Sequence, residues 1–262
     1  MKITALGPFS ATTDGAPIAP TAAKPRQILA LLAVHAGQVV PVATVIEEVW
    51  GTAASPKAHI TVQTYVLQLR TALGRALGDP AAAREVLVTR PGGYALLTGP
   101  DDVDLHVYDR LCADAQTALE QGDDPGAARL FRTALALWNG PAFDGLRLGA
   151  VLGLEAMRLE QSRAGVLERC LATELRLGAH ERLLPELADL TTHHPHDEAL
   201  HALFMTALDR SGHPQGALAV YESVRTRLDE HFGLLPSPDL RRLEREVRAR
   251  AATAPARPPQ PA

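Results

Sequence analysis

Apolar positions along the first hundred residues follow a strand-like pattern first and a helical pattern afterwards. Residues 1–20 alternate between short apolar runs and turn-forming Gly and Pro, which predicts short strands. Apolar residues then recur at helical spacing in three segments, residues 24–36, 42–50 and 57–77. A Gly follows each of the first two segments, at Gly37 and Gly51, as is typical of helix ends.

Two runs rich in β-forming residues come next, at residues 85–90 and 94–97, and they flank the turn sequence Pro91-Gly92-Gly93. This arrangement predicts a β-hairpin. A further brief strand is predicted at residues 39–41. Short strands, three helices and a hairpin, in this order over the first 98 residues, are the element order of a winged helix.

Beyond residue 103 the apolar spacing is helical throughout, up to about residue 250. A faint repeat lies within this part, because residues 122–131 match residues 212–221 position by position. Leu184, Leu187 and Leu190 also precede similar residues of the 212–224 segment by 34 positions. Small residues and an aromatic at this period are typical of stacked tetratricopeptide-like helix pairs. The predicted fold is therefore mainly α with a small β component: a winged helix-turn-helix followed by an all-α tetratricopeptide-like repeat domain.

Charge is distributed unevenly between these two parts. The chain has a net charge of −4, yet residues 1–98 hold eight Lys and Arg against five acids, so the first part carries +3 and the rest −7. A basic module joined to an acidic one is thereby indicated. The predicted organisation is a DNA-binding domain over residues 1–98, a linker over 99–103, a helical domain over 104–250, and a disordered Pro-rich tail over 251–262.

The third predicted helix carries the candidate chemistry. Val62, Val66, Leu69 and Leu73 are spaced four, three and four residues apart and form one core-facing stripe. The other faces carry amides, hydroxyls and cations but no acid, which suits base edges and phosphates in a major groove. Leu67 and Ile60 also point outward, either against a neighbouring helix or toward thymine methyls. The candidate DNA contacts on this helix are Lys57, Thr61, Gln63, Thr64, Tyr65, Gln68 and Arg70.

Arg90 stands immediately before the hairpin turn. In a winged helix this turn projects toward the minor groove, whose negative potential favours a cation. Arg90 is therefore a further candidate DNA contact. Each of these assignments has a plainer alternative: a polar helix face can be simple solvated surface, and Arg90 can be an ordinary exposed hairpin cation.

At this point the residues resemble a known family. The segments 24–32, 47–51, 61–74 and 92–94 are similar to the OmpR-type winged helix of the Streptomyces antibiotic regulatory protein (SARP) family. The second half resembles the bacterial transcriptional activator domain of the same family, through residues 104–105, 134–141, 174–178, 217–221 and 233–240. Members usually carry Arg at the position of Gln68 and an apolar residue at that of Thr64, so the resemblance does not fix the operator sequence.

The resemblance implies a transcriptional activator that binds tandem direct repeats of double-stranded DNA upstream of antibiotic (secondary-metabolite) biosynthetic promoters. It also implies two protomers side by side on DNA and contact with RNA polymerase holoenzyme. In this family the loop between the second and third helices lies toward polymerase, which makes Thr52 and Ser55 candidate polymerase contacts. A repressor, or a helical interaction scaffold using the same module, is the alternative.

Other chemistry is discounted on the same sequence. The His193–Glu198 cluster is predicted to lie on a loop between helices and not to hold a metal. No nucleotide-binding or nucleophile motif occurs, so neither an enzyme nor a cofactor is expected. Cys112 and Cys170 are expected to be reduced residues within helices. Without a signal peptide or a long apolar run, the protein is expected in the cytoplasm with no membrane partner.

Overall fold

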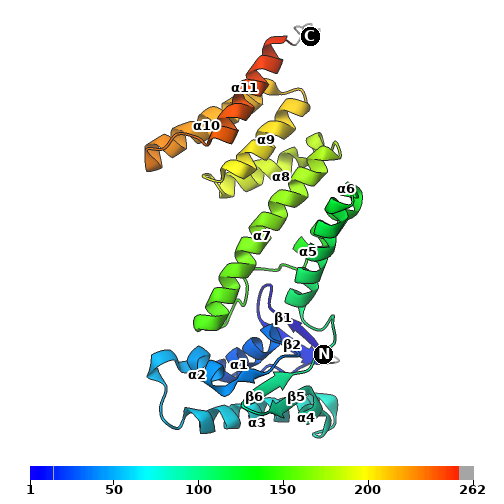
Figure 1. Ribbon diagram of the computed structural model, residues 1–262, viewed down its shortest axis with the longest axis vertical. Coiled ribbons are helices and arrows are strands. Elements are labelled where there is room, and N and C mark those ends of the chain that lie inside the picture. The colour runs from blue at the N-terminus through cyan, green and yellow to red at the C-terminus, as the bar shows by residue number, and fades with distance from the viewer. Residues whose placement is uncertain (14, 254–262) are drawn as a thin grey trace. The chain divides into compact units, whose positions relative to one another are not determined.

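The structure is a computed structural model that describes residues 1–13 and 15–253. Its first part contains two small antiparallel sheets and four α-helices (Figure 1). The elements up to residue 96 are β1 (Lys2–Thr4), β2 (Ser10–Thr13), β3 (Ala16–Pro17), α1 (Ala23–Val34), β4 (Val40–Pro41), α2 (Val42–Trp50), a 3-10 turn η1 (Gly51–Ala53), α3 (Ala58–Leu77), α4 (Ala82–Val86), β5 (Leu87–Arg90) and β6 (Gly93–Leu96).

The winged-helix prediction is confirmed, with one addition. Strands β1, β2 and β3 form one sheet, and β4, β6 and β5 form the second, in that order. In the hairpin, Arg90 pairs with Gly93 and Leu87 with Leu96. The short helix α4, between the third helix and the hairpin, includes Glu85 and Val86, so the prediction that the first hairpin strand begins at residue 85 is wrong. Five residues are too few to show a helical period in the sequence.

The second part is helical, as predicted, but not continuously so. Its elements are α5 (Asp104–Glu120), α6 (Asp124–Leu135), α7 (Ala150–Arg176), α8 (His180–His193), α9 (Glu198–Arg210), α10 (Pro214–Phe232) and α11 (Pro238–Thr253). Helix α11 includes residues 251–253, so the prediction of disorder is wrong for these three residues. The rest of that predicted tail, residues 254–262, lies outside the described residues.

Residues 136–149 interrupt the helices and lie against residues 5–9, the loop between β1 and β2. The backbone N–H groups of Asn139 and Phe143 donate to the carbonyls of Leu6 and Ala5, at 2.8 and 2.7 Å. Phe143 is buried and adopts a positive φ of 57°. The prediction of helix throughout is wrong here, because backbone hydrogen bonds of this segment are made to the distant loop between β1 and β2, which helical periodicity cannot reveal.

The chain divides into two compact units. The first comprises residues 1–117 and 129–166, and the second comprises residues 118–128 and the chain from residue 167 onward. The winged helix therefore shares one compact unit with the first part of the helical region. The predicted boundary at residues 99–103 stays a prediction about the sequence and is not where the compact units meet.

The second unit has two apolar clusters formed by successive helices. Leu171, Leu187 and Leu200 join α7, α8 and α9, while Met205, Tyr221 and Val247 join α9, α10 and α11. Glycines with φ between 78° and 87° stand two residues before α6, α8 and α10, at Gly122, Gly178 and Gly212. Such a φ favours Gly, so the sequence repeat marks equivalent turns between helices. Among the described residues, no helix is both long and apolar enough to span a membrane.

Candidate nucleic-acid interface

Helix α3 buries one stripe and exposes the others. Val62, Val66 and Leu69 are at most 1% exposed, and Leu73 is 2% exposed, so the predicted core stripe packs against the rest of the winged helix. The helix begins after Lys57 with no side-chain cap and ends at Gly78, which has the left-handed conformation expected of a helix C-terminus. This burial fixes the rotation of α3 about its axis and thereby the side chains that reach solvent.

The predicted contact residues of α3 divide into exposed and half-buried ones. Lys57, Gln63, Thr64 and Gln68 are exposed, while Thr61, Tyr65 and Arg70 are half-buried. The amides of Gln63 and Gln68 have no hydrogen-bond partner among the described residues, so both donors and acceptors remain available. The Thr64 hydroxyl donates to the Ile60 carbonyl at 3.2 Å, which leaves its lone pairs to accept from a base.

The two exposed apolar side chains of α3 have no packing partner that would bury them. Ile60 is 51% exposed and Leu67 62% exposed. Leu67, together with Thr64, Gln68 and other residues of α3, borders a surface groove of about 570 Å³ whose other wall is residues 17–22. Of the two roles that the sequence left open for Leu67, packing under a neighbouring helix of the described chain is therefore ruled out.

Arg70 is held against the hairpin. Its Nε and Nη2 donate to the carbonyl of Leu87 at 2.9 and 2.7 Å, and Nη2 also donates to the Thr89 hydroxyl at 2.8 Å. Burial lowers the pKa of this guanidinium, although an arginine remains charged in any case. Three hydrogen bonds therefore tie α3 to β5, and Nη1 remains for any contact outside the protein.

Arg90 differs from Arg70 in being unengaged. It is exposed at the end of β5, and its guanidinium has no hydrogen bond or ion pair with a described residue. The turn beside it requires glycine twice. Gly92 has a φ of 80°, and a Cβ at Gly93 would lie 2.1 Å from the carbonyl oxygen of Val40. These two glycines set the hairpin turn, and with it the position of Arg90.

An aromatic stack supports Tyr65 from inside. The rings of Tyr65 and Trp50 are 6.1 Å apart and nearly parallel, at 12°. The ammonium of Lys24 lies 4.9 Å from the centre of the Trp50 ring on α2. Lys24 and Trp50 were noted in the sequence only as family markers. Their stacking was not foreseen, because residues 24, 50 and 65 come together only through the packing of three helices.

Glu48 was missed as a structural residue. Its side chain is 2% exposed and accepts hydrogen bonds from Gln27 Nε2 and from the backbone N–H groups of Gly149, Val151 and Leu152, at 2.7–3.1 Å. A carboxylate at the start of α7 is favoured by the helix dipole and satisfies N–H groups that have no partner within the helix. Only the burial of Glu48 in the structure reveals this role, because a glutamate next to Glu47 on a short helix does not stand out in the sequence.

The loop after α2 is exposed from residue 51 to residue 57, so both Thr52 and Ser55 reach solvent. Gly51–Ala53 form a 3-10 turn in place of the open loop that was predicted. Thr52 also borders a pocket of about 670 Å³ whose wall includes Lys24, Trp50 and Arg147. The predicted polymerase-contact residues therefore lie on an accessible rim beside the aromatic stack.

Two acids of the His193–Glu198 segment accept hydrogen bonds from backbone N–H groups at the starts of helices or just before them. Asp197 caps α9 by accepting from the N–H groups of Ala199 and Leu200, at 3.0 and 3.1 Å. Glu198 accepts from the N–H of Ser237 at 2.7 Å. The described residues contain no group of three His, Cys, Asp or Glu able to hold a metal ion. His193 and Glu198 are parts of α8 and α9, and only residues 194–197 form the loop.

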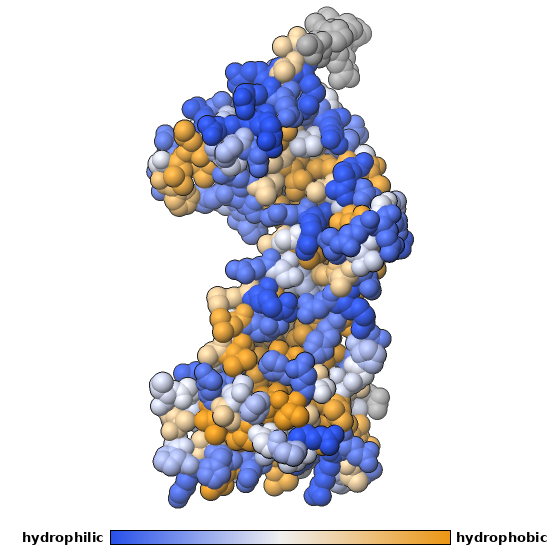
Figure 2. Space-filling view, in the orientation of Figure 1, coloured by the Kyte–Doolittle hydropathy of each residue, from blue (hydrophilic) through white to orange (hydrophobic). Residues whose placement is uncertain are grey.

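The densest group of arginines lies elsewhere, on α11. This helix carries five arginines, and Figure 2 shows a mostly hydrophilic surface over it. Arg242, Arg248 and Arg250 form ion pairs with Asp239, Glu244 and Asp209. Much of this positive charge is therefore neutralised within the protein.

Comparisons with known proteins agree with the resemblance seen in the sequence. Residues 17–96 match the family described as transcriptional regulatory protein, C terminal, and residues 103–248 match the bacterial transcriptional activator domain. Both are families of transcriptional regulators.

Similar proteins include the regulatory protein DnrI of Streptomyces peucetius, 43% identical over 94% of this chain and 92% of that protein. The transcriptional regulator RedD of Streptomyces coelicolor is 30% identical over 95% of this chain and 71% of its own length. The regulatory protein AfsR of Streptomyces griseus is 33% identical over 94% of this chain, which spans only 24% of AfsR. The solved structure of Mycobacterium tuberculosis EmbR superposes with a TM-score of 0.86 at 30% identity, over 95% of this chain and 65% of that one.

Proposed function

The chain belongs to the SARP family of transcriptional regulators, and from this membership we propose that it activates a secondary-metabolite biosynthetic cluster. In this proposal two protomers bind tandem direct repeats of double-stranded DNA near a promoter, and the bound protomers recruit RNA polymerase holoenzyme. We further propose that this occurs in the cytoplasm and that residues 1–98 act as the DNA-binding domain and residues 104–250 as the activator domain.

The observation that carries the proposal is the exposed face of α3. It combines unpartnered amides, hydroxyl acceptors and cations, it contains no acid, and it belongs to a helix whose rotation is fixed by a buried stripe. Such a helix can enter a major groove without bringing a negative charge near phosphate. A helix that only faces solvent can carry acids, whereas the 20 residues of α3 include none.

Within this face we assign two kinds of contact. Thr61, Thr64 and Gln68 are proposed to meet base edges, because an amide can make two hydrogen bonds to adenine in the major groove. Lys57, Gln63 and Tyr65 are proposed to meet phosphate or sugar, and the stack on Trp50 restricts the Tyr65 ring. Arg90 is proposed to enter the minor groove beside the hairpin turn.

We propose two roles for Arg70, one within the protein and one toward DNA. Its hydrogen bonds to Leu87 and Thr89 support a role in holding the hairpin at a fixed distance from α3, so that helix and hairpin reach adjacent grooves together. Its remaining Nη1 group can still donate to a phosphate oxygen. The DNA contact expected of Arg70 from the sequence is therefore only one part of its proposed role.

The direct test is footprinting with the full chain on the promoters nearest its gene, followed by transcription in vitro from the protected promoter. We expect protection of two direct repeats and increased transcript. Protection with reduced transcript would identify a repressor. Absence of any protected site, together with binding of protein partners, would support the interaction scaffold.

The polymerase contact is tested separately from DNA binding. Thr52→Arg and Ser55→Glu change an exposed loop, and surface substitutions usually alter free energies by less than about 0.5 kcal/mol, so operator affinity should stay close to that of the parent. Transcription from the same promoter should nevertheless fall. Equal losses in gel shift and transcription would mean that the loop acts through DNA, and full activity in both assays would remove it from the mechanism.

A further inference from the structure

A pocket of about 400 Å³ opens between α8, α9 and α10 in the second compact unit. This volume lies in the range of small-molecule sites. Its described walls combine apolar side chains with hydroxyls, one imidazole and one guanidinium: Thr191, Thr192, His201, Phe204, Ala219, Val220, Ser223 and Arg227. None of these lining residues is acidic.

His201 is buried in this wall, with only 1% of its surface exposed. Its Nδ1 lies 2.8 Å from the carbonyl oxygen of Asp197. Because a carbonyl can only accept, Nδ1 carries the hydrogen, and the second ring nitrogen, Nε2, has no partner among the described residues. Nε2 is not fully enclosed by the protein, so a ligand in the pocket that His201 lines can reach this free hydrogen-bonding position.

Arg227 supplies the charge of the pocket. Its Nη2 donates to the Ser223 hydroxyl at 2.7 Å, and its Nη1 donates to the Pro195 carbonyl at 3.5 Å. Each of these nitrogens has a second N–H that is not used in this way. Because the Ser223 oxygen accepts from Arg227, the Ser223 hydroxyl hydrogen remains available as another donor.

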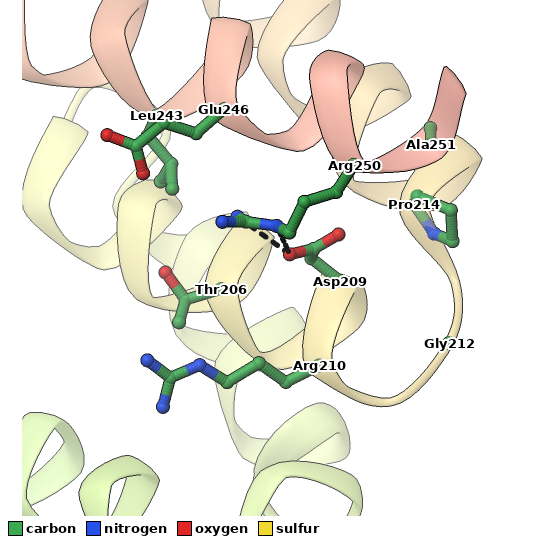
Figure 3. A pocket seen from close by; sticks show the side chains of 9 residues that line it. All are labelled: Thr206, Asp209, Arg210, Gly212, Pro214, Leu243, Glu246, Arg250 and Ala251. Carbon is green, nitrogen blue, oxygen red and sulfur yellow. Dashed lines mark hydrogen bonds and ion pairs between the residues drawn. The ribbon is translucent and has the colours of Figure 1, made fainter. Parts of the chain in front are cut away.

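A second pocket of the same unit provides the contrast. Between α9 and α11, a pocket of about 540 Å³ contains the ion pair of Arg250 and Asp209, as Figure 3 shows, and Glu246 also lines it. Its cations are therefore accompanied by carboxylates from the protein. No carboxylate lines the pocket that contains His201 and Arg227.

We propose that the pocket between α8, α9 and α10 binds the oxyanion group of a small molecule, a carboxylate or a phosphate, through Arg227, Ser223 and His201. Arg227 supplies a charged donor, Ser223 a hydroxyl donor, and Nε2 of His201 becomes a donor when the ring takes up a proton. Phe204 and Val220 provide apolar contact for the rest of the ligand. This proposal does not rest on the proposed DNA-binding function.

Proton uptake by His201 should accompany binding. Without ligand, burial lowers the pKa of His201, Arg227 on α10 lowers it further, and the hydrogen bond to the Asp197 backbone and the charges of Asp197 and Glu198 oppose these effects. Helix α8 contributes only Thr191 and Thr192 to the pocket, neither of them charged. A bound oxyanion favours the charged ring, so affinity should rise as the pH falls.

The experiment follows the histidine ring resonances of the full chain by NMR, with His201→Gln to assign the signal. Sulfate is the probe, because its charge does not change between about pH 6 and pH 8, and sodium chloride holds the ionic strength constant. We expect a saturable shift of the His201 signal, stronger binding at the lower pH, and binding weakened about tenfold or more by Arg227→Gln, since it removes charged hydrogen bonds.

The matched control is Arg225→Gln, because Arg225 lies on the same helix but pairs with Glu222. It should bind sulfate like the parent. Should Arg227→Gln fail to fold, Ser223→Ala at an exposed position gives the same comparison with a smaller loss. Titrations with succinate and with inorganic phosphate then distinguish carboxylate from phosphate ligands. The absence of a saturable shift, or equal losses in the Arg225 and Arg227 variants, would overturn the proposal.

Discussion

Helices α3 and α11 both carry cations, but most of those on α11 are in ion pairs with acids, whereas α3 itself contains no acid. Helix α11 has five arginines, three of which are in ion pairs with Asp239, Glu244 and Asp209. Helix α3 has fewer cations, yet it has no acid, and its exposed amides are unpartnered. Exposed ion pairs contribute little to stability, but they remove the net charge that a phosphate backbone would attract.

If α3 reads DNA as proposed, arginine density alone does not locate the DNA-binding surface of this chain. The whole chain has a net charge of −4. The winged helix is distinguished by where its polar groups lie and not by their number. Arg70 and Arg90 repeat the contrast on a smaller scale, since the first is bound to β5 and the second is unengaged. Substitutions on α3, in the hairpin and on α11 test this contrast.

Substitution of Arg70 should have the largest effect, because it acts on folding and on DNA binding together. Arg70→Ala leaves the Leu87 carbonyl without its donors, which should lower the free energy of unfolding by about 1–3 kcal/mol. Operator affinity should also fall, because the hairpin is no longer held to α3. Urea unfolding and gel shift on the same variant measure the two effects.

A double-mutant cycle separates this positioning role from a general loss of stability. If Arg70 acts through the hairpin, its substitution should weaken operator binding much less in a chain that already lacks the Arg90 side chain. Additive losses would show that the two arginines act independently. Arg70→Lys, which keeps the charge without the two-nitrogen contact to Leu87, should behave like Arg70→Ala.

Gln68→Ala should come next and should affect specificity alone. Loss of a two-hydrogen-bond contact to a base costs about 1–3 kcal/mol at the specific site and relaxes one base position. Folding should be unchanged, because the Gln68 amide has no partner among the described residues. Gel shifts on the operator and its single-base variants provide the measurement, and parent-like discrimination at every base pair would contradict the proposed readout.

Arg90→Ala should have a smaller effect, spread evenly over DNA sequences. A phosphate or minor-groove cation acts largely without sequence preference, so binding to operator and to random DNA should weaken alike. The slope of log affinity against log salt should decrease by about one unit. An unchanged slope would exclude Arg90 as a contact to the DNA backbone.

Arg242→Gln on α11 should have the least effect and serves as the control for the comparison. Its guanidinium already pairs with Asp239 at 2.8 Å on an exposed surface. Operator affinity should stay within about 0.5 kcal/mol of the parent, with the same salt slope. A slope reduced by one unit would show that α11 is also a phosphate-contact surface.

The sequence by itself determined the elements whose causes are local. Periodic apolar residues placed α1, α2 and α3, and Pro91-Gly92-Gly93 placed the hairpin, because helix spacing and turn chemistry depend on neighbouring residues. The same spacing identified Val62, Val66 and Leu69 as buried, and so identified which residues of α3 are exposed.

Only the tertiary structure decided how distant groups are satisfied. Arg70 donates to Leu87, Glu48 caps α7 about a hundred residues away, and residues 139–144 bind the loop between β1 and β2. His201 and Arg227 come together because α9 packs on α10. Such contacts form wherever folding brings an unpaired donor to an acceptor, and no spacing along the chain records which two will meet.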